Sequence, residues 1–183
     1  MRSTLVCSFL FSLALPTLSP QASAQKVELF GGYSYLRPAV PAVVTIVCPQ
    51  PPCPSTTTNY YPDLHGWEFA GTFKPGRIIG ITADFSGHYG SLLGTSMHEQ
   101  TYLFGPKITL PFGLYVHALA GDAHQSFNGG GGDAFAAAVG GGFDLKLIPF
   151  LSLRLIQVDY VYTHFHSDSQ HQPRISAGLV LRL

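Results

Sequence analysis

Charged side chains are scarce in this chain, and those present balance one another. They make up 11% of the residues, against roughly 25% in an ordinary soluble domain. Ten acidic residues accompany ten basic ones, and no stretch is basic enough to form a patch. A nucleic acid is therefore excluded as the expected partner, because binding its phosphates would require such a patch.

The chain also lacks an apolar run of the ~20 residues that a membrane-spanning helix needs. The apolar stretch over residues 5–15 is shorter; it follows Arg2 and is followed by an Ala-Ser-Ala pattern that ends at Ala24. A basic start, a short apolar core and small residues at a cleavage site are typical of a secretory signal. We therefore interpret residues 1–24 as a signal peptide and residues 25–183 as one mature domain.

Cysteine is rare as well, with three residues, of which Cys7 belongs to the signal segment. The other two, Cys48 and Cys53, lie in the sequence CPQPPC. In an oxidising compartment an isolated pair most simply forms a disulfide, which here would close a proline-rich loop. A metal or redox site is the alternative, but the pair lacks the C-x-x-C spacing and further cysteine ligands. We expect no cofactor and no metal.

Large apolar residues alternate with small or charged ones along much of the chain. This alternation is clearest between Ala134 and Phe165, and a period of two indicates strands with unlike faces. A turn at Ile148-Pro149-Phe150 would pair Leu147 with Leu151. Asp144 then lies opposite Arg154, so that a carboxylate meets a guanidinium on the small-residue face.

The same pattern predicts eight strands. They cover residues 26–36, 66–74, 78–89, 100–110, 114–123, 134–147, 151–165 and 173–183. Long loops are expected at Arg37 to His65, Gly90 to Glu99, His124 to Asp133 and His166 to Gln172, with turns of about three residues elsewhere. The alternation slips near Leu155-Ile156, which predicts a β-bulge. Loop lengths are thus segregated to the two ends of an antiparallel sheet.

Alternation alone does not say which face points outward. The polar face is dominated by Gly, Ala, Ser and Thr, which suit the crowded interior of an eight-stranded barrel. The apolar face carries aromatic residues near the strand ends, as interfacial girdles do. A closed barrel also pairs every backbone group without leaving an edge in lipid. We therefore predict an all-β, eight-stranded antiparallel up-and-down transmembrane barrel, apolar outside and polar within.

Residues 135–165, FAAAVGGGFDLKLIPFLSLRLIQVDYVYTHF, resemble the penultimate hairpin of the OmpA-type transmembrane domain and of the small outer-membrane β-barrel family. Residues 176–183, SAGLVLRL, resemble the C-terminal signal read by the barrel-assembly machinery, with Gly178, Leu181 and Leu183 in its pattern positions. The final Leu183 departs from the family's usual aromatic residue. The resemblance implies insertion into the outer membrane, in contact with its lipid.

The charges expected on the inner face nearly cancel. They are Glu28, Glu68, Asp84, Asp144, Asp159, Lys107, Lys146, Arg154, Arg174 and Arg182. We hypothesise that Asp144 and Arg154, near Lys107 and His117, form a salt-bridged plug in the periplasmic half of the lumen. The resemblance implies that such a network controls a narrow pore. The alternative, which we favour, is that the charges pair only because charges in a narrow lumen must do so.

Glu68 and Asp84 are neighbours of like sign, so we expect a shared proton, or Arg174 or water between them. Asp84, Ser86 and His88 share one face and invite a catalytic-triad interpretation. Residues two apart on a strand stand parallel some 6–7 Å apart, however, and do not form a hydrogen-bonded chain. His164 and His166 have a spacing that can hold a metal, although a loosely polar loop is the favoured interpretation.

The expected function is non-enzymatic: a structural or surface-interaction role of the adhesion type. The segment from Arg37 to His65 is the candidate surface for an extracellular ligand. The alternatives are a narrow pore for ions or small solutes and an envelope enzyme that modifies lipid A. An eight-stranded interior is just filled by side chains, which argues against a wide channel.

Overall fold

The computed structural model describes residues 26–45, 55–92, 94–127, 130–165 and 168–183. The predicted signal peptide over residues 1–24 and the predicted Cys48–Cys53 disulfide lie outside the described residues. Among those that are described, no helix has the length and apolar character needed to cross a bilayer.

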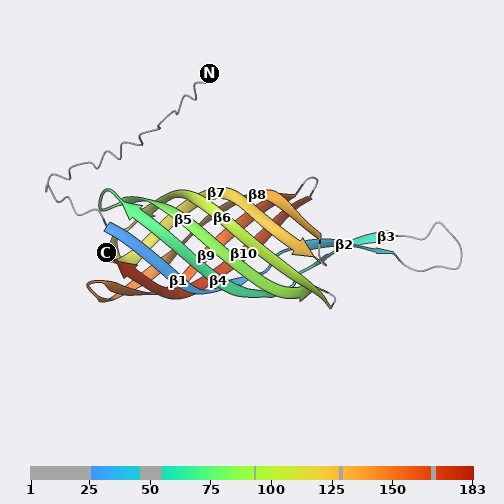
Figure 1. Ribbon diagram of the computed structural model, residues 1–183, viewed down its shortest axis with the longest axis horizontal. Helices are drawn as coiled ribbons and strands as arrows, with labels where there is room; N and C mark the ends of the chain where they lie inside the picture. The colour runs from blue at the N-terminus through green and yellow to red at the C-terminus, as the bar shows by residue number, and fades with distance from the viewer. Residues whose placement is uncertain (1–25, 46–54, 93, 128–129, 166–167) are drawn as a thin grey trace, which may run out of the picture.

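Eight strands form a closed barrel in which neighbours along the chain pair antiparallel, and β1 closes the ring by pairing with both β4 and β10 (Figure 1). The barrel strands are β1 (Lys26–Leu36), β4 (Leu64–Lys74), β5 (Ile79–Leu92), β6 (Thr95–Thr109), β7 (Leu114–Phe127), β8 (Gly130–Ile148), β9 (Leu151–Phe165) and β10 (Asp168–Arg182). The predicted all-β, eight-stranded antiparallel barrel is confirmed.

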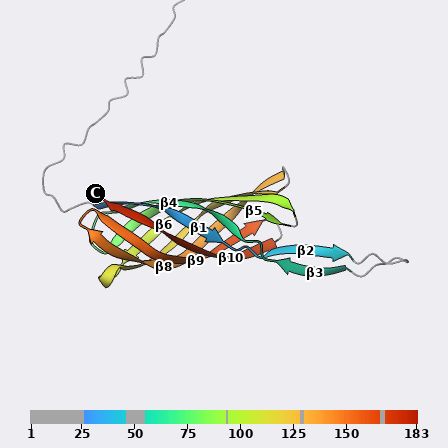
Figure 2. The ribbon, with the colours of Figure 1, turned by 90° about the horizontal axis from the view of Figure 1, so that it is seen from below.

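A second, separate sheet lies in the segment that the sequence was expected to leave as a loop. Strands β2 (Val40–Thr45) and β3 (Ser55–Tyr60) pair with each other in a two-stranded sheet. This hairpin extends beyond the barrel at the end opposite the C-terminus, and the view turned by 90° shows the same extension (Figure 2). We call this end of the barrel the hairpin end, and the end that carries Lys26 and Leu183 the terminal end.

The other three predicted long loops are mostly strand, so that expectation was wrong. β5 continues to Leu92, β6 begins at Thr95, and β10 begins at Asp168. Met97 and Glu99 are buried whereas Ser96 and His98 are exposed, so the inward–outward alternation continues through the predicted loop at residues 90–99. The polar composition that suggested loops belongs instead to the part of each hairpin that extends beyond the apolar band. Backbone pairing continues there, although the outward-facing side chains are polar.

At the terminal end the strands are joined by tight turns. The turn at Pro111–Gly113 is a single 3₁₀ turn (η1), in which Phe112 and Gly113 have φ of 63° and 86°. A Cβ at Gly113 would come within 2.2 Å of the Asp144 carbonyl oxygen. Glycine is therefore required there by both its backbone conformation and its close approach to β8.

The register of the β8–β9 hairpin is as predicted along most of its length. Asp144 lies opposite Arg154, and a register shift falls at Leu155 because Phe143 pairs with Ile156. The predicted bulge is confirmed. The expected pairing of Leu147 with Leu151 was wrong, since Ile148 is the partner of Leu151 and a second irregularity accommodates Leu147.

The barrel is apolar outside and polar inside, as predicted. Side chains such as Phe104 and Val139 are 62% and 58% exposed on the outer face. Inside, charged and hydroxyl-bearing side chains are buried, and Glu68, Asp84 and Arg174 are each 1% exposed. A water-soluble barrel would show the reverse arrangement. Lys146, expected among the inward charges, is exposed beside the turn instead.

Candidate functional site

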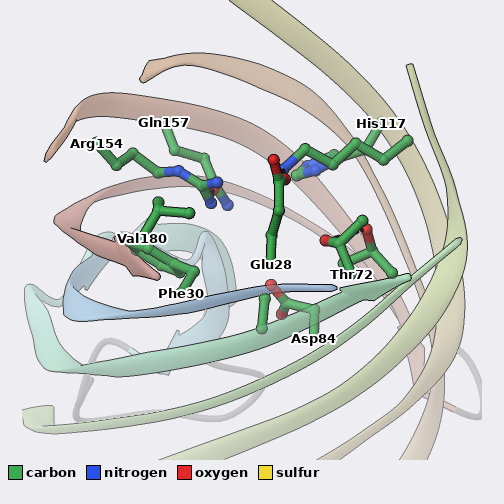
Figure 3. Close-up of a pocket in the computed structure, with 11 residues that line it drawn as sticks. Glu28, Phe30, Thr72, Asp84, His117, Arg154, Gln157 and Val180 are labelled. Carbon is green, nitrogen blue, oxygen red and sulfur yellow. Dashed lines mark hydrogen bonds and ion pairs between the residues drawn. The ribbon is translucent and has the colours of Figure 1, made fainter. Parts of the chain in front are cut away.

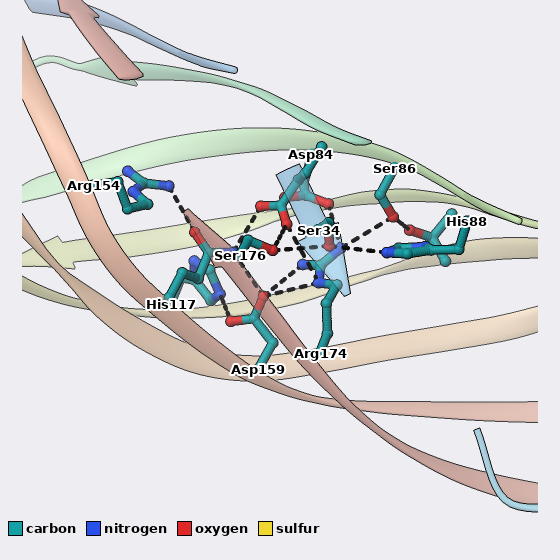
Figure 4. Close-up of polar contacts among 12 residues, drawn as sticks. Ser34, Asp84, Ser86, His88, His117, Arg154, Asp159, Arg174 and Ser176 are labelled. Carbon is teal, nitrogen blue, oxygen red and sulfur yellow. Dashed lines mark hydrogen bonds and ion pairs between the residues drawn. The ribbon is translucent and has the colours of Figure 1, made fainter. Parts of the chain in front are cut away.

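Side chains at every second position of the eight barrel strands point inward and fill the polar lumen. At its centre Arg174 on β10 contacts three carboxylates. Its Nη2 and Nε donate to Asp159 Oδ2 at 2.7 and 3.0 Å, and its Nη1 donates to Asp84 Oδ1 at 3.0 Å (Figure 4). Nε also lies 3.6 Å from Glu68 Oε2. Arg174 thus contacts both Glu68 and Asp84, and these two carboxyl groups also lie within hydrogen-bonding reach of each other.

A second cluster of charges lies toward the terminal end. Glu28 accepts from Lys74 at 2.7 Å, from Lys107 at 3.3 Å and from Arg182 at 3.1 Å. Arg182 also lies 3.6 Å from Asp144, at the rim of the barrel. One carboxylate therefore binds three cations, and these cations come from strands on different sides of the lumen.

Between the two clusters, Arg154 binds Asp144 with its Nε at 2.8 Å and its Nη2 at 3.3 Å. The guanidinium carbon also lies 4.1 Å from the ring centre of Phe30 and 4.4 Å from that of Tyr115. Two aromatic faces and a two-point carboxylate contact hold the cation rigidly. Figure 3 shows Arg154, Phe30 and Glu28 together at the lumen cavity.

The structure divides the predicted plug residues among different partners. Lys107 and His117 are opposite each other in register, but Lys107 Nζ contacts Glu28, whereas His117 Nε2 lies 2.7 Å from Asp159 Oδ1. The Asp144–Arg154 pair is therefore linked to Asp159 and Glu68 through a residue that the sequence did not single out, Gln157.

Gln157 Oε1 accepts from Arg154 Nη1, and its Nε2 donates to both Glu68 and Asp159, each of the three at 2.7 Å. The Gln157 side chain points inward because the bulge at Leu155 shifts the alternation of β9 by one residue. Applying this shift to the residues after Leu155 would have identified Gln157 as a lumen residue. Tyr115, 2% exposed, was also missed. It precedes His117 by two residues on the same strand, so alternation counted from that inward residue would have placed it in the lumen.

The described side chains leave little space between these clusters. The cavity enclosed by Glu28, Asp84, His117, Arg154 and Gln157 measures about 10 Å³, about the least that can hold one water. A wider vestibule of about 390 Å³ opens at the terminal end, lined by Glu28, Lys74, Arg77 and Arg182 among others. At the hairpin end, Leu36, Leu64 and Met97 form an apolar cluster that we call the lid.

The residues considered for catalysis have other partners. Ser86 Oγ bonds Thr101 at 2.6 Å, His88 Nε2 lies 2.9 Å from Ser34 Oγ, and Asp84 binds Arg174. The three are not joined in a hydrogen-bonded chain. His166 lies outside the described residues, and His164 bonds Ser169 at 3.1 Å. Within the described ranges, no three His, Cys, Asp or Glu residues are grouped as metal ligands.

Tyrosine–histidine pairs ring the outer face toward the hairpin end. Hydrogen bonds of 2.5 Å join Tyr33 to His65 and Tyr160 to His171, and the rings of Tyr89 and His98 meet edge to face at 5.2 Å. Aromatic side chains with polar tips are typical of the boundary between apolar and aqueous surroundings. The pairs therefore place amphipathic side chains on the outer face in the part of the barrel nearer the hairpin end.

No protein-family model matches this chain, and no curated protein sequence matches it significantly. Solved structures do match. Ail, the attachment invasion locus protein of Yersinia pestis, in complex with the heparin analogue sucrose octasulfate, is 13% identical; the match covers 87% of this chain and 99% of Ail, with a TM-score of 0.58. Neisserial surface protein A is 10% identical, covering 85% and 96% of the two chains, with a TM-score of 0.54.

OprG, an outer membrane protein from Pseudomonas aeruginosa, is 9% identical over 87% of this chain and 96% of OprG, with a TM-score of 0.50. These neighbours are small eight-stranded outer-membrane barrels. At such low identity they show the fold alone. No family-model match supports the narrower resemblance of residues 135–165 to the OmpA-type transmembrane domain.

Proposed function

We propose that this protein is an outer-membrane barrel with a structural or surface-interaction role, and that its lumen is closed. The observation that carries the proposal is the inverted distribution of side chains. Large apolar residues cover the outside of the barrel, while a buried network centred on Arg174 fills the inside. Such a barrel is stable when lipid surrounds it, and it offers solutes no open path.

Strand length and loop distribution support one orientation. Barrel strands of 11–19 residues meet or exceed the roughly 9–11 that a tilted strand needs to span a membrane. Most connections between barrel strands are short at both ends, but the projecting hairpin lies at one end only, and the longer connections of such barrels are extracellular. The proposal therefore places the hairpin end outside the cell. Gly178, Leu181 and Leu183 at the end of β10 remain the proposed signal for the barrel-assembly machinery.

The hairpin is the proposed contact surface for a partner. Residues 38–60 contain no charged side chain, and β2 and β3 pair only with each other among the described residues. Each strand therefore has an edge at which a partner strand can add. An uncharged surface of this kind suits a protein partner, whereas the ligand bound to Ail is a heparin analogue and would require basic residues.

Replacing residues 41–60 with a short glycine–serine linker tests the hairpin. We expect the variant to form a normal barrel, because β1 and β4 pair along their full length without the hairpin. We also expect a bacterium expressing it to lose adherence to epithelial cells. Thr58→Lys, which puts a charge on β3, is the matched variant and should weaken adherence in a full-length chain. Unchanged adherence of both variants would refute the role of the hairpin.

A narrow pore is the second candidate, and the vestibule at the terminal end favours it. This vestibule of about 390 Å³ reaches Glu28 and Lys74, so movement of the Asp144–Arg154 pair could extend it inward. The pore candidate predicts that Arg154→Ala raises the open-state frequency in planar bilayers by about tenfold or more. Arg37→Ala, at a side chain that is 53% exposed and pairs with Asp63, is the control. An unchanged open-state frequency in Arg154→Ala would refute the proposal that the Asp144–Arg154 pair gates a pore.

A further inference from the structure

Glu99 differs from the other carboxyl groups buried in the described part of the barrel. These groups belong to Glu28, Glu68, Asp84, Glu99, Asp144 and Asp159. The other five each lie within 4.0 Å of a lysine or arginine nitrogen. Glu99 has no such cation among the described residues, although it is 0% exposed. The charge of one buried carboxylate is therefore left uncompensated by the protein.

The contacts of Glu99 are to neutral amides, and they satisfy one of its two oxygens. Gln125 Nε2 donates to Oε2 at 3.2 Å, and Gln172 Nε2 donates to the same oxygen at 3.4 Å. Oε1 is buried and has no hydrogen-bond partner among the described atoms. Burying a charged group in this state is unfavourable, so a further group at Oε1 would stabilise the protein.

Two more buried atoms without partners belong to side chains next to Glu99. His88 is directly opposite Glu99 on β5, which places their Cβ atoms roughly 5 Å apart. Its Nε2 bonds Ser34, as Figure 4 shows, whereas its Nδ1 has no partner. Gln172 Oε1 is also without one. Turning the Gln172 amide over would direct this oxygen, in place of Nε2, toward Glu99. The bonds that Nε2 donates to Thr163 at 3.2 Å and to Gln170 at 3.1 Å would be exchanged for the bond to the cation.

These acceptors lie just below the lid, which keeps water from reaching them freely. Met97 belongs to the lid and precedes Glu99 by two residues on the same inward face of β6. On the other side, the Arg174 network fills the lumen. A cation held here would be enclosed on both sides, and the low local dielectric would strengthen its attraction to Glu99.

We propose that Glu99 Oε1, His88 Nδ1 and Gln172 Oε1 bind one divalent cation of the Mn²⁺ or Zn²⁺ class in the hairpin half of the lumen. Imidazole together with carboxylate and amide oxygens suits these ions better than Mg²⁺ or Ca²⁺, which prefer oxygen ligands alone. One ligand is an amide, so the site differs from the His/Cys/Asp/Glu clusters whose absence from the described ranges is noted above. The site lies inside the barrel and does not depend on what surrounds the outer face.

The test is to refold the mature chain from urea into detergent micelles with MnCl₂, ZnCl₂, MgCl₂ or EDTA, so that an ion can be enclosed as the barrel closes. We expect Mn²⁺ or Zn²⁺ to raise the Tm of the wild type by several degrees, and Mg²⁺ to raise it less. Electron paramagnetic resonance should detect about one retained Mn²⁺ per barrel after washing. His98→Ala, which removes an exposed histidine of β6, should leave both results unchanged.

Glu99→Gln is the matched variant, because its amide can donate to the acceptors that the cation would otherwise bind. We expect it to fold in EDTA with a Tm at or above that of the wild type, and to lose the ion response. His88→Asn, as a second variant, should weaken Mn²⁺ retention at least about tenfold. An equal ion response in the wild type and Glu99→Gln would assign binding to exposed histidines and overturn the proposal. No ion response in the wild type would show that a proton or a water serves Glu99 instead.

Discussion

Arg174→Met should destabilise the barrel more than any other single substitution in the lumen. The arginine is 1% exposed and contacts Asp84, Asp159 and Glu68. Its removal leaves these three carboxylates close together with no lysine or arginine of the described residues against them. Removing one partner of a buried ion pair costs about 3–5 kcal/mol. We therefore expect a loss of at least this size in urea titrations of the refolded protein.

The matched control for this prediction is Arg37→Met. Arg37 lies 3.6 Å from Asp63, with both side chains more than half exposed, and exposed pairs contribute about 0–1 kcal/mol. Asp84→Asn or Asp159→Asn added to Arg174→Met should restore part of the loss, because each removes one unpaired charge. If Arg174→Met and Arg37→Met had equal effects, the network would not hold the lumen together.

Val139→Arg should have the second-largest effect, and it tests the outer face. Val139 is the middle residue of β8 and is 58% exposed on the outside of the barrel. In water such a position tolerates arginine with little change, since exposed substitutions usually matter little. At the midplane of a bilayer the same side chain costs about 2–4 kcal/mol. We expect a loss in that range when folding is measured in phospholipid vesicles.

Ser96→Arg is the comparison variant for Val139→Arg. Ser96 is exposed near the end of β6, two residues from the turn at the hairpin end. Its substitution should change stability by less than about 1 kcal/mol, because arginine near the interface reaches water. Equal effects of the two substitutions would mean that lipid does not surround the middle of the barrel.

The barrel could be predicted from the sequence because its two faces are chemically unlike along every strand. Alternation assigned the inward direction of Glu68, Asp84 and Arg174 and placed Asp144 opposite Arg154. The same signal failed at the hairpin end, where polar residues replace apolar ones on the outer face although the strands continue. The β2–β3 hairpin was missed because its proline-rich surroundings are typical of a loop.

The contacts of the lumen were harder to predict than its composition. Register places side chains on neighbouring strands, but Arg174 on β10 reaches Asp84 on β5, across the barrel. Similarly, Lys107 faces His117 in register and yet contacts Glu28. Long side chains in a closed barrel can contact residues on strands that are not adjacent to their own. Which residue they contact depends on barrel curvature and on the bulge that turns Gln157 inward.

Fluorescence of the single tryptophan tests the central claim most directly. Trp67 is the only tryptophan in the chain; it lies on the outer face of β4 and is 47% exposed. In vesicles of brominated phospholipid we predict strong quenching of its emission and weak quenching by iodide in the water. Strong quenching by iodide, with no effect of brominated lipid, would contradict the outward orientation of the apolar face.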